Sequence, residues 1–136
     1  MDEQVAGAVV ERRIDMSELI EATREGDIIT IILNNPDKRN ALTMQAWVQL
    51  AHTFAQITTD ETVRCIVIRG AGDKAFAAGA DISEFSVVRA NAEQAAEYGK
   101  ATALALDALV NCLHPTIALI QGACTGGGLE IAAACD

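Results

Sequence analysis

The residues best suited to chemistry lie in the segment QGACTGGGLE, residues 121–130. An apolar run leads into it, so a strand is expected to end in a glycine-rich turn that opens a helix. Unpaired backbone N–H groups gather at such a helix start, and glycine lets another group approach them closely. Glu130 follows Gly127 by three residues, about one helical turn, so the two share a similar face. An amide donor beside a carboxylate suits stabilisation of an enolate oxygen together with transfer of a proton.

The spacing alone leaves a second interpretation open. Three glycines also permit tight packing of a helix on a strand, and Glu130 would then only complement the helix dipole. Nucleotide-binding patterns do not fit, because no Lys-Ser/Thr pair follows the glycines and G-x-G-x-x-G spacing is absent. Neither His52 nor His114 has the context of a Ser-His-Asp set, and we expect both side chains to face solvent.

A second segment with the same character is KAFAAGADI, residues 74–82. Its small residues leave backbone open to a ligand, and Asp81 is placed to cap a short helical turn. On its own, the segment also fits a tight surface connection. Two loops of this kind, each after a strand, favour one shared site. Lys38 and Arg39 form a small basic spot that either contacts an anionic ligand or is simply solvated.

Hydrophobic periodicity predicts the elements that must position these loops. A hairpin is expected from two β-rich runs, and the helix after it has an apolar stripe that makes Trp47 a core residue. The predicted elements are strands at 19–23, 28–33, 64–69 and 116–120, a loop at 70–81, and helices from Thr43, at 92–113 and at 129–135. Their alternation predicts an α/β fold. We expect residues 1–17 to form a mobile lead-in and residues 18–136 to form one domain or part of one.

Composition narrows the classes of function. Hydrophobic residues make up 51% and charged residues 21%, as in globular proteins, and the net charge of −9 argues against a nucleic-acid partner. The four cysteines lack metal-ligand spacing, so we expect buried free thiols and no metal site. The N-terminus does not resemble a signal peptide, and no apolar stretch reaches the ~18 residues of a membrane helix. A cytoplasmic protein without a membrane partner is expected.

Three segments taken together resemble the crotonase superfamily, also called enoyl-CoA hydratase/isomerase. They are GDIITIILNNPDKRNAL (26–42), VRCIVIRGAGDKAFAAGADISEF (63–85) and HPTIALIQGACTGGGLEIAAACD (114–136). The resemblance implies a crotonase-like spiral of β-β-α units. It also implies a homo-oligomer, either a trimer or a hexamer made of two trimers. Because the chain stops at Asp136, the spiral is expected to be truncated about halfway, with the covering helices missing.

The resemblance also implies roles for individual residues. The backbone amides of Ala80 and Gly127 would hold the thioester oxygen, and Glu130 would be the first of two catalytic glutamates, the second lying beyond Asp136. The backbone of four consecutive residues, Ala80, Asp81, Ile82 and Ser83, would line the acyl-CoA near its thioester. Lys38 and Arg39 would lie near the phosphates of coenzyme A.

The implied function is that of an enoyl-CoA hydratase, a lyase of fatty acid β-oxidation that adds water across the 2,3-double bond of an enoyl-CoA thioester. Coenzyme A is then part of the substrate, and no separate cofactor is expected. Two alternatives stay open. One is an enoyl-CoA isomerase or another crotonase-type acyl-CoA enzyme, and the other is a non-catalytic acyl-CoA-binding fragment. The sequence does not define the length of the acyl chain.

Overall fold

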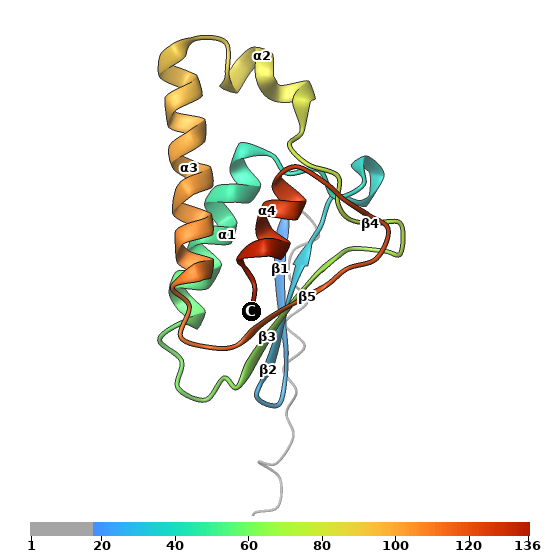
Figure 1. Ribbon diagram of the computed structural model, residues 1–136, viewed down its shortest axis with the longest axis vertical. Helices are drawn as coiled ribbons and strands as arrows, with labels where there is room; N and C mark the ends of the chain where they lie inside the picture. The colour runs from blue at the N-terminus through green and yellow to red at the C-terminus, as the bar shows by residue number, and fades with distance from the viewer. Residues whose placement is uncertain (1–17) are drawn as a thin grey trace, which may run out of the picture.

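The computed structural model describes residues 18–136, so the lead-in expected at residues 1–17 lies outside the described residues. The elements are β1 (Ile20–Glu25), β2 (Ile28–Leu33), η1 (Pro36–Lys38), α1 (Met44–Ile57), β3 (Cys65–Gly70), β4 (Ala75–Ala77), η2 (Ile82–Glu84), α2 (Phe85–Val88), α3 (Ala92–Val110), β5 (Thr116–Leu119), β6 (Ala123–Cys124) and α4 (Gly127–Ala134). Two strands followed by helix occur three times along this order (Figure 1). The prediction of an α/β fold built from β-β-α units is confirmed.

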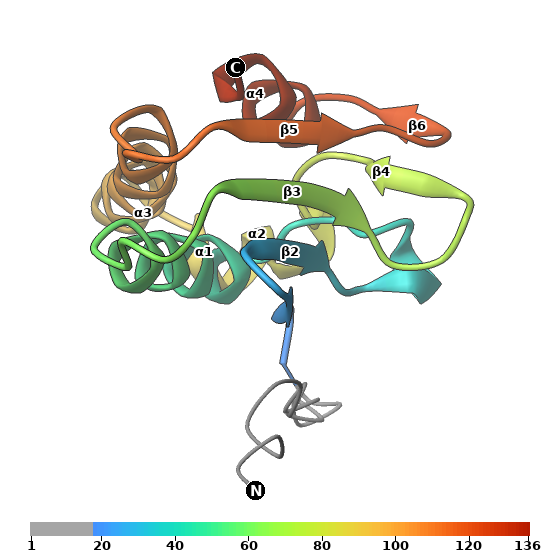
Figure 2. The same cartoon turned by 90° about the horizontal axis from the view of Figure 1, so that it is seen from below.

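The main sheet has the strand order β1-β2-β3-β5. β1 and β2 form the predicted antiparallel hairpin, and Gly26 at its turn has a φ of 62°, a conformation that glycine adopts without steric cost. β2, β3 and β5 run parallel to one another. Their carboxyl ends therefore lie at one edge of the sheet. The short strands β4 and β6 pair in parallel beyond that edge (Figure 2).

Helices α1 and α3 lie side by side and complete the core (Figure 1). Thr43 caps α1, because its hydroxyl accepts a hydrogen bond of 3.0 Å from the Ala46 amide. The apolar stripe of α1 buries Trp47, Leu50 and Phe54 in the core formed with the sheet and α3. Each such side chain contributes roughly 1.5–3 kcal/mol when it leaves water. Trp47 is 2% exposed, which confirms the prediction that it belongs to the core.

The structure differs from the predicted elements in two places that matter for the site. The predicted loop at 70–81 contains β4, and β4 pairs with β6, which lies far along the chain. A strand of three residues has no periodicity of its own, so only this pairing reveals it. The last helix begins at Gly127 rather than at Leu129. Glycine is a weak helix former, and packing against the rest of the fold overrides that preference here.

Two smaller expectations were wrong. His114 is half-buried rather than solvent-facing, and its Nε2 lies 3.1 Å from the Ile57 carbonyl oxygen. The four cysteines are free, as expected, but they are half-buried rather than buried. Burial still raises the pKa of the Cys124 and Cys135 thiols. Among the helices of residues 18–136, none is both long and apolar enough to cross a membrane.

Candidate active site

Three loops lie beyond the carboxyl edge of the main sheet, after β2, β4 and β5, and are bonded to one another there. We call residues 34–43 the first loop, residues 78–84 the second loop and residues 120–126 the third loop. The Leu42 amide donates to the Gly79 carbonyl at 2.7 Å, and the Asp81 amide donates to the Leu42 carbonyl at 2.8 Å. The Thr125 side chain donates to the Ala78 carbonyl at 2.9 Å. The second loop is therefore held between the first and the third.

Ala80 and Gly127 lie on backbones that approach each other closely. A methyl group built on Gly79 would lie 4.0 Å from the Cα of Gly126, so the residues that precede the two amides are neighbours. Both glycines have positive φ, 109° and 52°, which turns the chain just before each amide. Within residues 18–136, neither the Ala80 nor the Gly127 amide donates to a protein acceptor. Two N–H groups on adjoining loops therefore remain available to an acceptor atom of a ligand.

At each position of the triplet Gly126-Gly127-Gly128, a different steric reason favours glycine. Gly126 has positive φ. A Cβ on Gly127 would lie 2.7 Å from Cζ2 of Trp47, and a Cβ on Gly128 would lie 2.3 Å from the Ala77 carbonyl oxygen. The packing interpretation of the triplet therefore holds. It also supports the chemical interpretation, because the same contacts fix the position of the Gly127 amide.

Glu130 lies in the first turn of α4 and is exposed. Its amide donates to the Gly126 carbonyl at 3.0 Å, which is part of the helix start. Its carboxylate forms no hydrogen bond or ion pair with any other described residue. An uncommitted carboxylate one turn after Gly127 is free to accept a proton or to hold a water molecule.

Asp81 is 7% exposed, and its carboxylate is fully engaged. It accepts hydrogen bonds from the Ser83 hydroxyl, from the Ser83 amide at 3.0 Å and from Lys38 Nζ at 3.0 Å. The Ser83 hydroxyl, followed by Lys38, holds the pKa of Asp81 below its ordinary value. Asp81 caps η2 through the Ser83 amide, as predicted. This carboxylate serves the shape of the second loop rather than acid–base chemistry.

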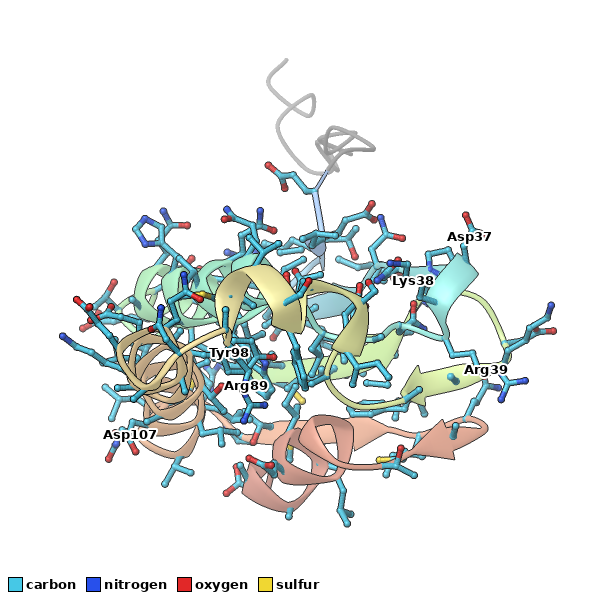
Figure 3. All side chains as sticks on the ribbon, turned by 90° about the horizontal axis from the view of Figure 1, so that it is seen from above. Asp37, Lys38, Arg39, Arg89, Tyr98 and Asp107 are labelled. Carbon is cyan, nitrogen blue, oxygen red and sulfur yellow. The ribbon has the colours of Figure 1, made fainter. Side chains whose placement is uncertain are left out.

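The remaining predicted residues lie around the second loop. Lys38 also donates to Ser83 Oγ at 3.1 Å, which leaves one of its three N–H groups for a ligand. Arg39 is exposed and has a φ of 51°. Ile82 is 75% exposed, so the loop presents an apolar side chain to solvent. Lys38 is the last residue of η1 and Arg39 follows it, and Figure 3 labels both on the side of the molecule that carries η1.

Asn40 was missed by the sequence analysis. It is 1% exposed, its amide group donates to the Ala71 and Ala75 carbonyls at 3.0 and 2.8 Å, and its side-chain oxygen accepts from the Asn35 amide at 3.0 Å. It therefore ties the first loop to the segment that leads into β4. Its φ of 56° is one that asparagine tolerates better than most residues. An asparagine in a polar loop that follows a strand is a candidate for positive φ, and this was the signal in the sequence that could have identified Asn40.

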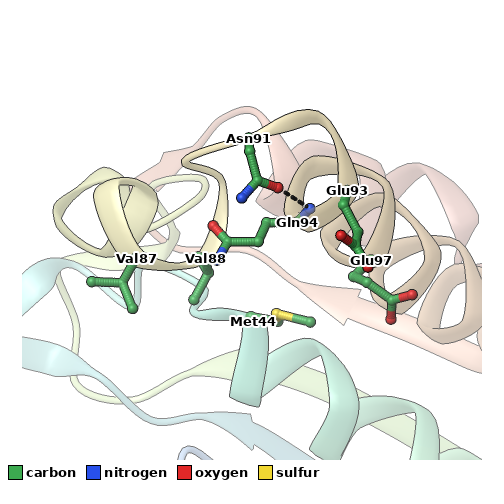
Figure 4. A pocket seen from close by; sticks show the side chains of 7 residues that line it. All are labelled: Met44, Val87, Val88, Asn91, Glu93, Gln94 and Glu97. Carbon is green, nitrogen blue, oxygen red and sulfur yellow. Dashed lines mark hydrogen bonds between the residues drawn. The ribbon is translucent and has the colours of Figure 1, made fainter.

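An open pocket of about 460 Å³ lies between Met44 at the start of α1, α2 and the first turns of α3 (Figure 4). The Glu84 carboxylate accepts a hydrogen bond of 2.6 Å from the Met44 amide, and Met44 lines the pocket. The other lining residues are Val87, Val88, Asn91, Glu93, Gln94 and Glu97. They come from α2, α3 and the link between them, so no local pattern predicts the pocket. No group of three or more His, Cys, Asp or Glu side chains able to hold a metal occurs among the residues described.

Comparison with known proteins extends over almost all of the described chain. The family described as enoyl-CoA hydratase/isomerase matches residues 23–136. The short-chain-enoyl-CoA hydratase of Clostridium acetobutylicum is 33% identical over 113 residues, which cover 83% of this chain and 42% of that protein. The peroxisomal Delta(3,5)-Delta(2,4)-dienoyl-CoA isomerase of Arabidopsis thaliana is 28% identical over 129 residues, which cover 88% of this chain and 46% of that protein.

A solved structure agrees with these relatives. The crystal structure of an enoyl-CoA hydratase/carnithine racemase from Magnetospirillum magneticum superposes with a TM-score of 0.85 at 50% identity. The match covers 88% of this chain and 45% of that one. The chain thus spans less than half the length of each of these three proteins.

Proposed function

The chain belongs to the enoyl-CoA hydratase/isomerase family, and we propose that it carries the thioester-binding part of an enoyl-CoA hydratase. The reaction is addition of water across the 2,3-double bond of an enoyl-CoA. The observation that supports this proposal is the pair of uncommitted amides at Ala80 and Gly127, with the free carboxylate of Glu130 one helical turn further on.

The two amides act on the thioester oxygen. When the oxygen atom of water bonds to C3, the π electrons of the double bond move toward the thioester, and negative charge collects on its oxygen as an enolate. Fixed N–H groups stabilise this charge more than the neutral carbonyl, so they lower the barrier. Each donor of this kind contributes about 3–4 kcal/mol. C2 then takes up a proton, and the hydroxyacyl product is complete.

Glu130 is the group we assign to the water. Its carboxylate positions the molecule and accepts one proton as the bond to C3 forms. In the hydratases that the chain resembles, a second glutamate shares the proton transfers. We expect that residue to come from outside the 136 residues described by this sequence.

The coenzyme A portion of the substrate is assigned to the first two loops. The free N–H of Lys38 and the exposed guanidinium of Arg39 are suited to phosphate groups. The exposed Ile82 offers an apolar contact to the pantetheine arm beside the backbone of Asp81 and Ser83. Coenzyme A enters and leaves with the acyl group, so the proposal requires no separate cofactor.

The test uses the full-length protein and crotonyl-CoA, whose hydration removes the absorbance of the conjugated thioester. Glu130→Gln keeps the shape of the side chain and removes its basicity, so we expect the rate to fall about 10²- to 10⁴-fold. Glu61→Gln, a change at an exposed position in the link between α1 and β3, outside the three loops, is the matched control. Hydration by Glu130→Gln at the rate of the unchanged protein would remove the assigned role.

An isomerase is the second candidate, and one observation favours it. Glu130 has an uncommitted carboxylate about one helical turn after Gly127, whereas Asp81 is fully engaged, and a single base can carry a proton between C2 and C4. Product analysis separates the two functions. A hydratase converts a 2-enoyl-CoA to a hydroxyacyl-CoA, while an isomerase converts a 3-enoyl-CoA to a 2-enoyl-CoA without consuming water.

A non-catalytic acyl-CoA-binding fragment is tested by calorimetry of the 136-residue chain with an acyl-CoA. Binding without turnover would support it, and a folded chain that releases no heat would exclude it.

The trimeric or hexameric assembly also remains a prediction, which sedimentation of the full-length protein can check.

A further inference from the structure

The directions of the Ala80 and Gly127 N–H groups are fixed by the carbonyls that precede them. A peptide unit is planar, and those of the described chain are trans, so the C=O of one residue and the N–H of the next point in opposite directions. The Gly79 carbonyl accepts the hydrogen bond of 2.7 Å from the Leu42 amide. The Ala80 N–H therefore points away from Leu42 and the first loop.

The same reasoning applies to Gly127. The Gly126 carbonyl accepts the hydrogen bond of 3.0 Å from the Glu130 amide, so this carbonyl points along α4. The Gly127 N–H therefore points out of the amino end of the helix. These bonds orient each amide, but neither of them determines how far apart the second loop and the start of α4 lie.

Thr125 is the residue that joins the second loop to the third. It directly follows β6, which lies beside β4 (Figure 2). Its amide donates to the Ala77 carbonyl at 3.1 Å, and its hydroxyl donates to the Ala78 carbonyl at 2.9 Å. Its own carbonyl accepts from the Gly128 amide at 3.0 Å. Thr125 is therefore bonded to the second loop and to the start of α4 at once.

The hydroxyl bond of Thr125 is made close to both amides. Ala78 and Thr125 each lie two residues before one amide of the pair. Beyond them, no hydrogen bond of the described chain joins residues 79–84 directly to residues 126–130. The distance between the two amides is therefore restrained by Thr125 and by van der Waals contact.

Van der Waals contact restrains the two segments mainly in one direction. A Cβ built on Gly126 would lie 3.5 Å from the Cα of Gly79, so the two backbones lie close together. Such contact opposes a closer approach, but each atom pair attracts too weakly to oppose separation. A hydrogen bond does oppose separation, and the branched Cβ of threonine limits rotation of the hydroxyl. The bond is exposed, so water can bind the Ala78 carbonyl when the hydroxyl is removed, and the fold would survive its loss.

Resting on the proposed function, we propose that Thr125 is a positioning residue for the thioester site. Its hydroxyl sets the distance between the Ala80 and Gly127 amides so that both donate to one thioester oxygen. Two donors lower the barrier only when both lie within hydrogen-bond distance of the charge that forms in the transition state. In this role Thr125 acts through the backbone and does not contact the substrate.

The experiment compares Thr125→Val and Thr125→Ser in the full-length protein during hydration of crotonyl-CoA. Valine keeps the branched shape and removes the hydroxyl, whereas serine keeps the hydroxyl. We expect Thr125→Val to lower kcat about 5- to 50-fold, which is part of the loss that follows removal of one donor. KM should change little, because the contacts to coenzyme A are untouched. Thr125→Ser should retain most of kcat.

Thr53→Val is the matched control. The Thr53 hydroxyl donates to the Gln49 carbonyl at 2.8 Å within α1, so the variant loses a bond of the same kind outside the three loops. It should leave kcat unchanged. Urea unfolding of each variant checks that folded proteins are compared.

A chromophoric ligand gives a readout that a loss of stability does not change. The absorption of the conjugated thioester para-dimethylaminocinnamoyl-CoA moves to longer wavelength when hydrogen bonds polarise its carbonyl group. The protein is added until all of the ligand is bound, so the shift does not depend on affinity. We expect a smaller shift with Thr125→Val than with the unchanged protein. Thr125→Ser and Thr53→Val should give the full shift.

The outcomes separate this inference from the proposed function. If Thr125→Val keeps the kcat and the absorbance shift of the unchanged protein, the positioning role is overturned and the proposed function stands. A lower kcat with a full absorbance shift, or an equal loss in Thr53→Val, overturns the role as well. A shift without hydration of crotonyl-CoA overturns the hydratase alone, and the absorbance comparison then decides on Thr125. If the unchanged protein shows no shift, the proposed function is overturned and the role of Thr125 fails with it.

Discussion

Replacement of Gly127 by alanine tests whether packing positions the oxyanion amide. The added Cβ would lie 2.7 Å from Cζ2 of Trp47 and 3.3 Å from Cδ1 of Leu42. Ordinary carbon contacts lie near 3.5–4.0 Å, so the start of α4 and the indole must separate by about 1 Å. Trp47 is 2% exposed and has no room to swing into solvent, so the helix start is expected to move.

The expected loss of activity is larger than the loss of stability. A shift of about 1 Å takes the Gly127 amide out of hydrogen-bond reach of the thioester oxygen, and loss of one such donor lowers kcat about 10²- to 10³-fold. Overpacking costs about 1–3 kcal/mol, and the gain from replacing glycine within a helix returns about 0.5–1 kcal/mol. We therefore expect the free energy of unfolding to fall by at most about 2.5 kcal/mol.

The assay combines crotonyl-CoA hydration with urea unfolding of the full-length protein. Adding Trp47→Phe to Gly127→Ala removes the clashing part of the indole and should restore at least tenfold of the lost activity, with a favourable coupling between the two changes. Gly99→Ala is the control, because a Cβ there meets nothing within 4 Å and only stiffens α3. The reasoning is refuted by Gly127→Ala at full activity, or by a double variant as slow as the single one.

Three further changes probe the loops and the start of α4. Asn40→Ala leaves buried carbonyls without donors and should lower the free energy of unfolding by about 2–4 kcal/mol in urea titrations; a loss below about 1 kcal/mol contradicts its structural role. The folded pKa of Asp81 lies below its ordinary value of 3.8, so its contribution to stability is present above about pH 4 and is lost as pH falls through the lower folded pKa. Acid unfolding of Asp81→Asn should therefore depend less on pH below about pH 4, and an unchanged acid limb would oppose this. Gly128→Ala places a Cβ 2.3 Å from the backbone oxygen of Ala77, so we expect little folded protein by circular dichroism, and a native spectrum would show that α4 can move away.

Local patterns were enough for most of the elements. The hairpin follows from two β-rich runs around Gly26, and α1 from apolar residues at three- and four-residue steps that bury Trp47. These signals are local because the spacing of apolar residues that is typical of a strand or a helix can be recognised within a short stretch of sequence. The alternation of strands and helices was sufficient to predict the α/β class. The motifs that resemble the crotonase superfamily singled out Ala80, Gly127 and Glu130, whose roles stay predictions.

The sequence by itself thus determined the order of the elements, the glycine-rich turns and the identity of the residues available for chemistry. Only the tertiary structure decided which of them meet. Lys38 and Asp81 pair across 43 positions, β4 exists through its pairing with β6, and Arg89 lies over two rings that come from different helices. Such contacts form because parallel strands bring loops that are distant in the sequence to one edge of the sheet. A short-range sequence pattern does not predict which of these loops come into contact.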